Sequence, residues 1–200
     1  FRTKEGLVFQ GSLRPYRDAV FLEFKVHNET GTDLAWVDIN PCLRLGSAPE
    51  FNYPYEMQKI YVRVNNAWMP LSETTPTPEQ MGRNPWVIMR CQESLVPYAG
   101  PKEQPNLWLL DQVADVNLIA AESKDGKYLI GYAWDTAPQV LMSNGGYPCL
   151  HTGPGPLLGL ENQKTAYRRG IVYFMENNKD ALLQRYERDR FIWAKWPKRP

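Results

Sequence analysis

The feature that most constrains this fold is an alternation of apolar and polar residues that recurs in short runs separated by turn residues. It is clearest in Ala19–Asn28, where polar residues alternate with four apolar ones, Val20, Leu22, Phe24 and Val26. Successive side chains of a β-strand point to opposite faces, so this run predicts a strand with one buried face. We expect residues 34–39 to form a hairpin with it, because residues 28–33 between them are rich in turn-forming types.

Two pairs of turn residues predict further hairpins. Asn65-Asn66 separates two short β-prone runs, and Asp125-Gly126 separates two longer ones. Asn and Gly tolerate the positive φ angles that a two-residue turn requires. A hydrophobic run over residues 169–175 predicts another strand, placed in the interior of a sheet.

One segment departs from this pattern. Residues 178–191 have an asparagine that can cap a helix, basic residues toward their end, and apolar residues at helical spacing, namely Leu182, Leu183 and Tyr186. Many short strands with a single helix are typical of a sandwich and not of a βαβ fold. We therefore expect residues 1–200 to form one all-β domain, an antiparallel β-sandwich or jelly roll with a C-terminal amphipathic helix. A closed barrel is the main alternative.

The charge balance argues against two classes of partner. The 23 Lys and Arg residues nearly cancel the 22 Asp and Glu residues, so no overall field attracts nucleic acid or an anionic membrane. No run approaches the roughly 20 apolar residues that span a bilayer. Because the chain starts at Phe1 and not at Met, we expect an exported protein, periplasmic or extracellular, from which a leader has been removed.

Residues 143–159 form the most unusual stretch, rich in Gly and Pro. Cys149 and His151 lie two residues apart, so on an extended strand both side chains face the same side. An imidazole titrates close to neutral pH, which makes His151 a candidate general acid or base with Tyr147 as its partner. The alternative is that Gly and Pro shape a tight crossover in which His151 hydrogen-bonds a carbonyl group.

The cysteines and histidines are few. Cys42, Cys91 and Cys149 leave at least one thiol unpaired and have no CxxC spacing. A Cys42–Cys149 bridge would link two sheets of an exported protein, but buried, unreactive thiols are the preferred interpretation. With only His27 and His151, and without HxH or HExxH spacing, we expect no transition metal and no cofactor; a calcium ion held by Asp and backbone oxygens stays open.

Arg168 and Arg169 are candidates for holding an anionic group. A guanidinium binds a carboxylate or sulfate through two parallel hydrogen bonds. Neighbouring residues on a strand face opposite ways, so only one of the two can point into a given site. Solvated positions at a sheet edge are the alternative.

Aromatic residues provide a second candidate site. Trp68, Trp86 and Trp108 lie near two long loops that contain proline, residues 71–84 and 97–105. An indole ring can stack on the apolar face of a sugar while polar side chains, here those of Asn144 and Asp135, bind its hydroxyl groups. Packing in the core is the alternative for each tryptophan.

The region around residues 135–169 resembles the last part of a group of uncharacterised bacterial β-sandwich proteins. The resemblance covers about a third of the chain, and its shared elements are Ala133-Trp134, Pro148-Cys149-Leu150-His151, Thr165, Arg168-Arg169-Gly170 and Tyr173-Phe174 before the terminal helix. It brings no activity with it. Similar domains often accompany polysaccharide-active enzymes, which implies carbohydrate as the ligand class.

Three functions are therefore in view. The first is a carbohydrate-binding or accessory domain that holds a glycan with loop aromatics. The second is a metal-independent acid/base enzyme, a lyase or hydrolase acting on a sugar or uronate, with His151, Tyr147 and Arg168 or Arg169 in its site. The third is a subunit-interaction module in which the aromatic and basic residues 192–200 make a homo-oligomer.

Overall fold

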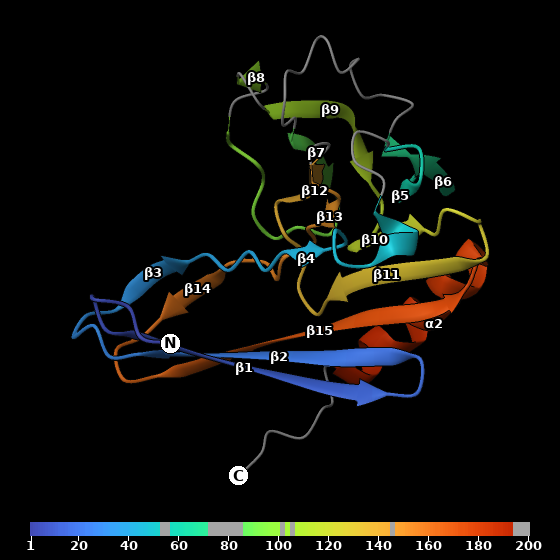
Figure 1. Cartoon of the computed structure of the whole chain (residues 1–200). Coiled ribbons are helices and arrows are strands. Elements are labelled where there is room, and N and C mark those ends of the chain that lie inside the picture. The colour runs from blue at the N-terminus through green and yellow to red at the C-terminus, as the bar shows by residue number, and fades with distance from the viewer. Residues whose placement is uncertain (53–56, 72–85, 101–102, 105–106, 145–146, 194–200) are drawn as a thin grey trace.

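The computed structural model describes residues 1–52, 57–71, 86–100, 103–104, 107–144 and 147–193. These residues form a β-sandwich-like fold with one α-helix at the C-terminal end, as the strand pattern predicts. Figure 1 shows a large sheet with the helix α2 on one side and a smaller β layer on the other. Within the described residues, no helix is long and apolar enough to cross a membrane.

The larger sheet has seven strands, all paired antiparallel. In spatial order they are β1 (Leu7–Tyr16), β2 (Ala19–Asn28), β15 (Thr165–Glu176), β11 (Tyr128–Trp134), β10 (Leu118–Glu122), β5 (Ile60–Val64) and β6 (Ala67–Pro70). Strand β15 pairs with β2 on one side and β11 on the other, which confirms the interior position predicted from its hydrophobic run.

The smaller layer is built from one sheet and two ribbons. The sheet contains β12 (Val140–Asn144), β7 (Trp86–Cys91), β9 (Leu107–Ala114) and β8 (Glu103–Gln104). The ribbons are β13 (Cys149–Leu150) with β4 (Leu43–Arg44), and β14 (Leu157–Leu160) with β3 (Leu34–Val37); a short 3-10 helix, η1 (Pro49–Phe51), follows β4. Strands β7 and β9 run parallel, which is a departure from the antiparallel arrangement expected throughout.

Two of the three predicted hairpins are correct. Asn65 and Asn66 adopt φ angles of 51° and 64° between β5 and β6, and Gly126 has a φ of 73° between β10 and β11. The hairpin between Ala19–Asn28 and residues 34–39 is wrong. Both edges of β2 are occupied by longer partners, β1 and β15, so β3 leaves the large sheet and pairs with β14.

The large sheet is buried on both faces near its middle. In β10, Leu118 and Ala120 face the helix, while Ile119 and Ala121 face the smaller layer. This explains why β10 reads as a continuous apolar run and β2 as an alternating one. The smaller layer therefore covers the face of the large sheet that carries Ile119 and Ala121.

Helix α2 (Lys179–Trp193) packs on the opposite face of that sheet. The side-chain oxygen of Asn178 accepts a hydrogen bond from the backbone N–H of Ala181, at 2.9 Å, as a helix cap. The predicted apolar stripe is buried and consists of Leu182, Leu183 and Tyr186. Leu182 lies over Gly131 of β11, where any larger residue would meet its methyl groups.

Candidate functional site

Strand β13 brings a thiol and an imidazole to the junction between the two ribbons and the smaller sheet. Its Cys149 pairs with Arg44 of β4, and just beyond it His151 exchanges two backbone hydrogen bonds of 2.9 Å with Met142 of β12. One ligand atom from each of Cys149, His151 and Cys42 lies within 4.8 Å of the other two. The prediction that Cys149 and His151 face the same side is confirmed.

Among the described residues, only one ring nitrogen of His151, Nδ1, has a hydrogen-bond partner. Its Nδ1 lies 3.1 Å from the side-chain oxygen of Asn40, and its ring meets that of Trp86 edge to face at 5.3 Å between centroids. An amide oxygen only accepts, so Nδ1 carries the proton and Nε2 holds the lone pair. Nε2 is buried and has no hydrogen-bond partner among the described residues.

Burial also sets the protonation state of this site. Desolvation lowers the pKa of His151 to about 4, so the ring is neutral at pH 7. Desolvation raises the pKa of the Cys149 thiol to about 12, so it keeps its proton at that pH. A neutral imidazole therefore lies beside a protonated thiol, and not an imidazolium beside a thiolate.

All three cysteines lie within the described residues and are free thiols, so the Cys42–Cys149 bridge, which was the alternative to unreactive thiols, is not formed. The sulfurs of Cys42 and Cys149 lie within 4.8 Å of each other without a bond between them. Cys91 and Cys149 are buried as expected, whereas Cys42 is exposed. One sequence feature could have indicated that Cys42 and Cys149 lie close together. The tripeptide Pro-Cys-Leu occurs at residues 41–43 and again at residues 148–150, and strands β4 and β13, which contain its two leucines, pair with each other.

An open groove adjoins the cluster. It runs between residues 38–40, residues 138–142 and the turn at residues 153–156. Three of its side chains are polar, those of Asp38, Asn40 and Gln139, and most of the others are apolar. Asn40 belongs to both places, because the amide that lines the groove also holds His151.

The two predicted arginines separate onto opposite faces of β15, as their spacing requires. Arg168 faces the smaller layer and donates to the carbonyls of Gly155 and Pro156, at 3.1 and 2.8 Å. Arg169 instead pairs with Glu23 at 3.2 Å on the other face of the sheet. Arg168 thus fixes the turn that forms one wall of the groove and does not meet His151.

Tyr147, the predicted partner of His151, is 60% exposed. Its ring lies 5.8 Å from the guanidinium carbon of Arg44, and its backbone N–H donates to the side-chain oxygen of Asn144 at 3.3 Å. The side-chain partner of His151 in the structure is Asn40. The acid/base set of His151, Tyr147, Arg168 and Arg169 is therefore not assembled.

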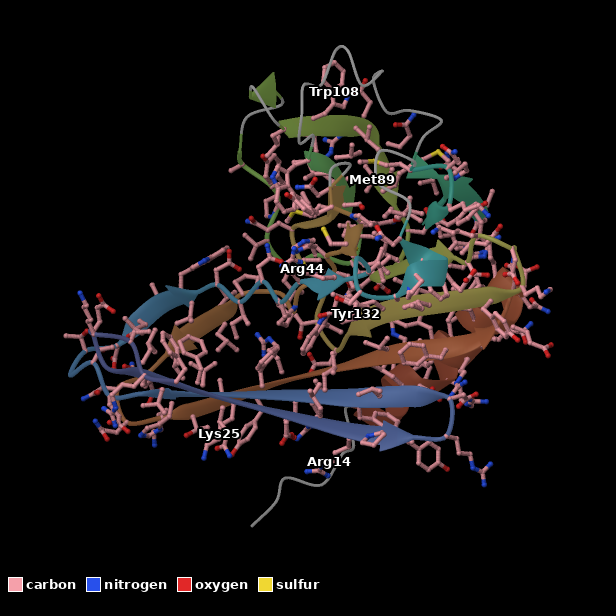
Figure 2. All side chains as sticks on the ribbon, viewed as in Figure 1. Arg14, Lys25, Arg44, Met89, Trp108 and Tyr132 are labelled. Carbon is pink, nitrogen blue, oxygen red and sulfur yellow. The ribbon has the colours of Figure 1, made fainter. Side chains whose placement is uncertain are left out.

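The predicted sugar-binding residues also disperse. Trp86 and Asn144 are register partners close to His151, with Asn144 buried. Trp108 packs against the inner core, and Figure 2 shows it at the end of the smaller layer remote from Arg44. Trp68 packs instead near the helix side of the large sheet, and Asp135 is exposed beside Thr136.

Some predicted features lie outside the described residues. They include residues 72–84 of the first long loop, part of the second, Gly145-Gly146, and residues 194–200 of the tail expected to make a homo-oligomer.

Comparison with known proteins yields similarity at the level of solved structures. No protein-family model matches the chain, and no curated protein matches it. Among solved structures, the Slr1438 protein from Synechocystis sp. PCC 6803 is similar, with a TM-score of 0.41 and 10% sequence identity. The match covers 84% of this chain and 54% of Slr1438, so the chain spans about half the length of that protein.

Proposed function

We propose that this chain is a carbohydrate-binding domain whose ligand lies in the groove between residues 38–40 and 153–156. The observation that carries the proposal is an exposed aromatic and aliphatic pair, Trp36 and Leu158, on the ribbon that leads into this groove. Sugar sites combine an apolar platform for the ring with a few polar groups for the hydroxyls. Both components are present here, at residues other than the predicted tryptophans.

The platform is part of the β3–β14 ribbon. Trp36 and Leu158 pair across it and are 42% and 52% exposed, whereas the neighbouring pair, Val37 and Leu157, is buried. Asp38 and Pro156, which line the groove, lie two residues beyond Trp36 and two before Leu158. Because alternate residues of an extended chain share a face, the platform continues into the groove.

The polar side chains of the groove suit hydroxyl groups. The carboxylate of Asp38 accepts hydrogen bonds, and the amides of Asn40 and Gln139 both donate and accept. The oxygen of Asn40 is engaged by His151, so its NH₂ group is the part left for a ligand. Among the described residues that line the groove, Asp38 carries the only charge, and a negative charge favours a neutral glycan over an acidic one.

The wall of the groove is held in place before any ligand arrives. Arg168 donates to the carbonyls of Gly155 and Pro156, and the N–H of Gly155 donates to the carbonyl of Thr136 at 3.0 Å. A turn fixed in this way does not have to be ordered on binding, which favours affinity for a weakly held ligand such as a sugar.

A panel of neutral and acidic polysaccharides, titrated against the full chain by calorimetry and tryptophan fluorescence, tests the proposal. We expect saturable binding to a neutral glycan, weakened about tenfold or more by Trp36→Ala and by Asp38→Ala. Tyr128→Ala is the matched control, because Tyr128 is 53% exposed on the large sheet, away from the groove. Silence across the panel, or equal losses in Trp36→Ala and Tyr128→Ala, would contradict it.

A further inference from the structure

We propose that Cys42, Cys149 and His151 form a binding site for one zinc ion per chain. The two cysteine sulfurs and Nε2 of His151 are its ligands, and a fourth position is left for water or an external group. None of these three ligands is among the side chains proposed to bind carbohydrate, although Asn40, which holds His151, also lines the groove.

The geometry of the three residues suits a tetrahedral ion. Zinc binds sulfur at about 2.3 Å and imidazole nitrogen at about 2.0 Å, so ligand atoms around it lie roughly 3.3 to 3.8 Å apart. One atom from each residue already lies within 4.8 Å of the other two. This upper limit exceeds the tetrahedral separations by about 1 Å.

The orphan nitrogen of His151 is an independent observation that points to a ligand. The residue is 5% exposed, and its buried Nε2 has no hydrogen-bond partner among the described residues. Leaving a buried acceptor unsatisfied is unfavourable, and coordination removes the deficit. Nδ1 is meanwhile tied to Asn40, as histidine ligands of metals commonly donate their other ring N–H to an oxygen acceptor.

The donor set selects the class of ion. Two sulfurs and one imidazole are soft or borderline ligands, which favour zinc over the oxygen-seeking calcium and magnesium. The exposure of Cys42 gives an ion a path from solvent to the two buried ligands. Three protein ligands with an open fourth position are typical of zinc sites that bind an external group.

Zinc binding should release protons from the two thiols. Both thiols give up a proton to solvent when their sulfurs bond to zinc, and the neutral imidazole gives up none. The charge of the ion is then cancelled by the two thiolates, so no net charge is left at the partly buried site. About two protons should be released for each ion taken up.

Zinc titration of the full, reduced chain against a chromophoric chelator tests the proposal. We expect one ion per chain, and cobalt in its place should show sulfur-to-metal charge-transfer absorption. Cys42→Ser should weaken binding more than about 100-fold, beyond the 10- to 100-fold loss expected from Asn40→Ala, which removes only the residue that positions His151. Asn40→Ala should retain the charge-transfer absorption, because both sulfurs remain.

The chain supplies a matched control for each kind of ligand. Cys91→Ala and His27→Gln remove the remaining cysteine and histidine, neither of which belongs to the cluster, and should leave zinc affinity unchanged. Cys42 is exposed, so its substitution should not disturb folding, which circular dichroism checks. In the unmodified chain, zinc should also slow alkylation of Cys42.

Three results would overturn the proposal. The folded, reduced chain could take up no zinc and show no protection of Cys42. Cys42→Ser could bind as tightly as Cys91→Ala. The reduced chain could ignore zinc while mild oxidation joins Cys42 to Cys149, in which case the pair is a redox couple. Loss of glycan binding in Trp36→Ala with zinc affinity intact would separate this site from the proposed function.

Discussion

The two sides of the large sheet use their polar groups in different ways. On the helix side, polar groups tie α2 to the strands: Lys179 contacts Glu122 at 2.8 Å, and both guanidinium NH₂ groups of Arg185 bind Asp18. At the β4–β13 junction, Nε2 of His151 has no hydrogen-bond partner in the part of the chain that the structure describes, and two thiols lie beside it. We infer that the helix side serves stability, whereas the junction retains groups for a ligand.

The largest expected effect is on the helix side. Leu182→Ala should lower the free energy of unfolding by about 2–5 kcal/mol, because the side chain is fully buried over Gly131 and its removal leaves a cavity. Urea denaturation followed by circular dichroism measures the change. Leu158→Ala removes the same atoms from an exposed leucine of β14 and should cost less than about 0.5 kcal/mol. Equal costs would break the contrast between the two sides.

The ion pairs of the helix side should show in the pH dependence of stability. Burial opposes ionisation of Glu122, but hydrogen bonds from Lys179 and Asn177 outweigh it and lower the pKa of this carboxyl below 4.5. Its contribution is thus present above pH 4.5 and is lost as the pH falls through the lower folded-state pKa. Glu122→Gln should cost about 1–3 kcal/mol at pH 7.

Urea midpoints at pH 7 and pH 3 test this assignment. The difference in stability between the original chain and Glu122→Gln should shrink at pH 3, where the carboxylate of the original chain is being protonated. The substitution also removes an ion pair with Lys59, whose Nζ lies 3.6 Å from the carboxylate and donates as well to the carbonyls of Ser123 and Lys124. A difference that stays constant with pH would show that packing, and not charge, accounts for the loss.

Local patterns predicted local structure well. The period of two located β2, the 3.6-residue stripe located α2, and Asn65-Asn66 located a turn, because each depends on neighbours in the sequence. What the sequence could not predict depends on distant partners. Residues 34–39 were predicted to pair with β2, because no local feature of the sequence shows that β15 occupies that edge of β2. The meeting of Cys42 with His151 likewise needs a ribbon between segments more than 100 residues apart.

Two of the sequence elements singled out above, Ala133-Trp134 and Arg168-Arg169-Gly170, are neighbours in the large sheet. Trp134 of β11 pairs there with Gly170 of β15. A Cβ atom at Gly170 would lie 2.6 Å from the indole ring of Trp134. The first two elements are therefore in contact through the packing of Trp134 on Gly170. The Pro148-Cys149-Leu150-His151 element lies elsewhere, at the β4–β13 junction.

Gly170→Ala tests this packing explanation. We expect a cost of about 1–3 kcal/mol in the free energy of unfolding, because a rigid indole in a packed core cannot move aside freely. Gly46→Ala is the control, since a Cβ atom there meets nothing within 4 Å. If the two substitutions had the same effect, close approach of Trp134 would not be the reason for glycine at position 170.

The smallest expected effect on the free energy of unfolding is that of Cys42→Ser, which removes a proposed zinc ligand. Without metal, Cys42→Ser should change the free energy of unfolding by no more than about 0.5 kcal/mol, because the side chain is exposed. Zinc should then stabilise the original chain and not the variant, since an ion that binds only the folded state shifts unfolding in proportion to its affinity. Urea denaturation with zinc or with a chelator measures both. A large metal-free cost would mean that Cys42 holds the fold together, and the division between a stabilising helix side and a ligand-binding junction would not stand.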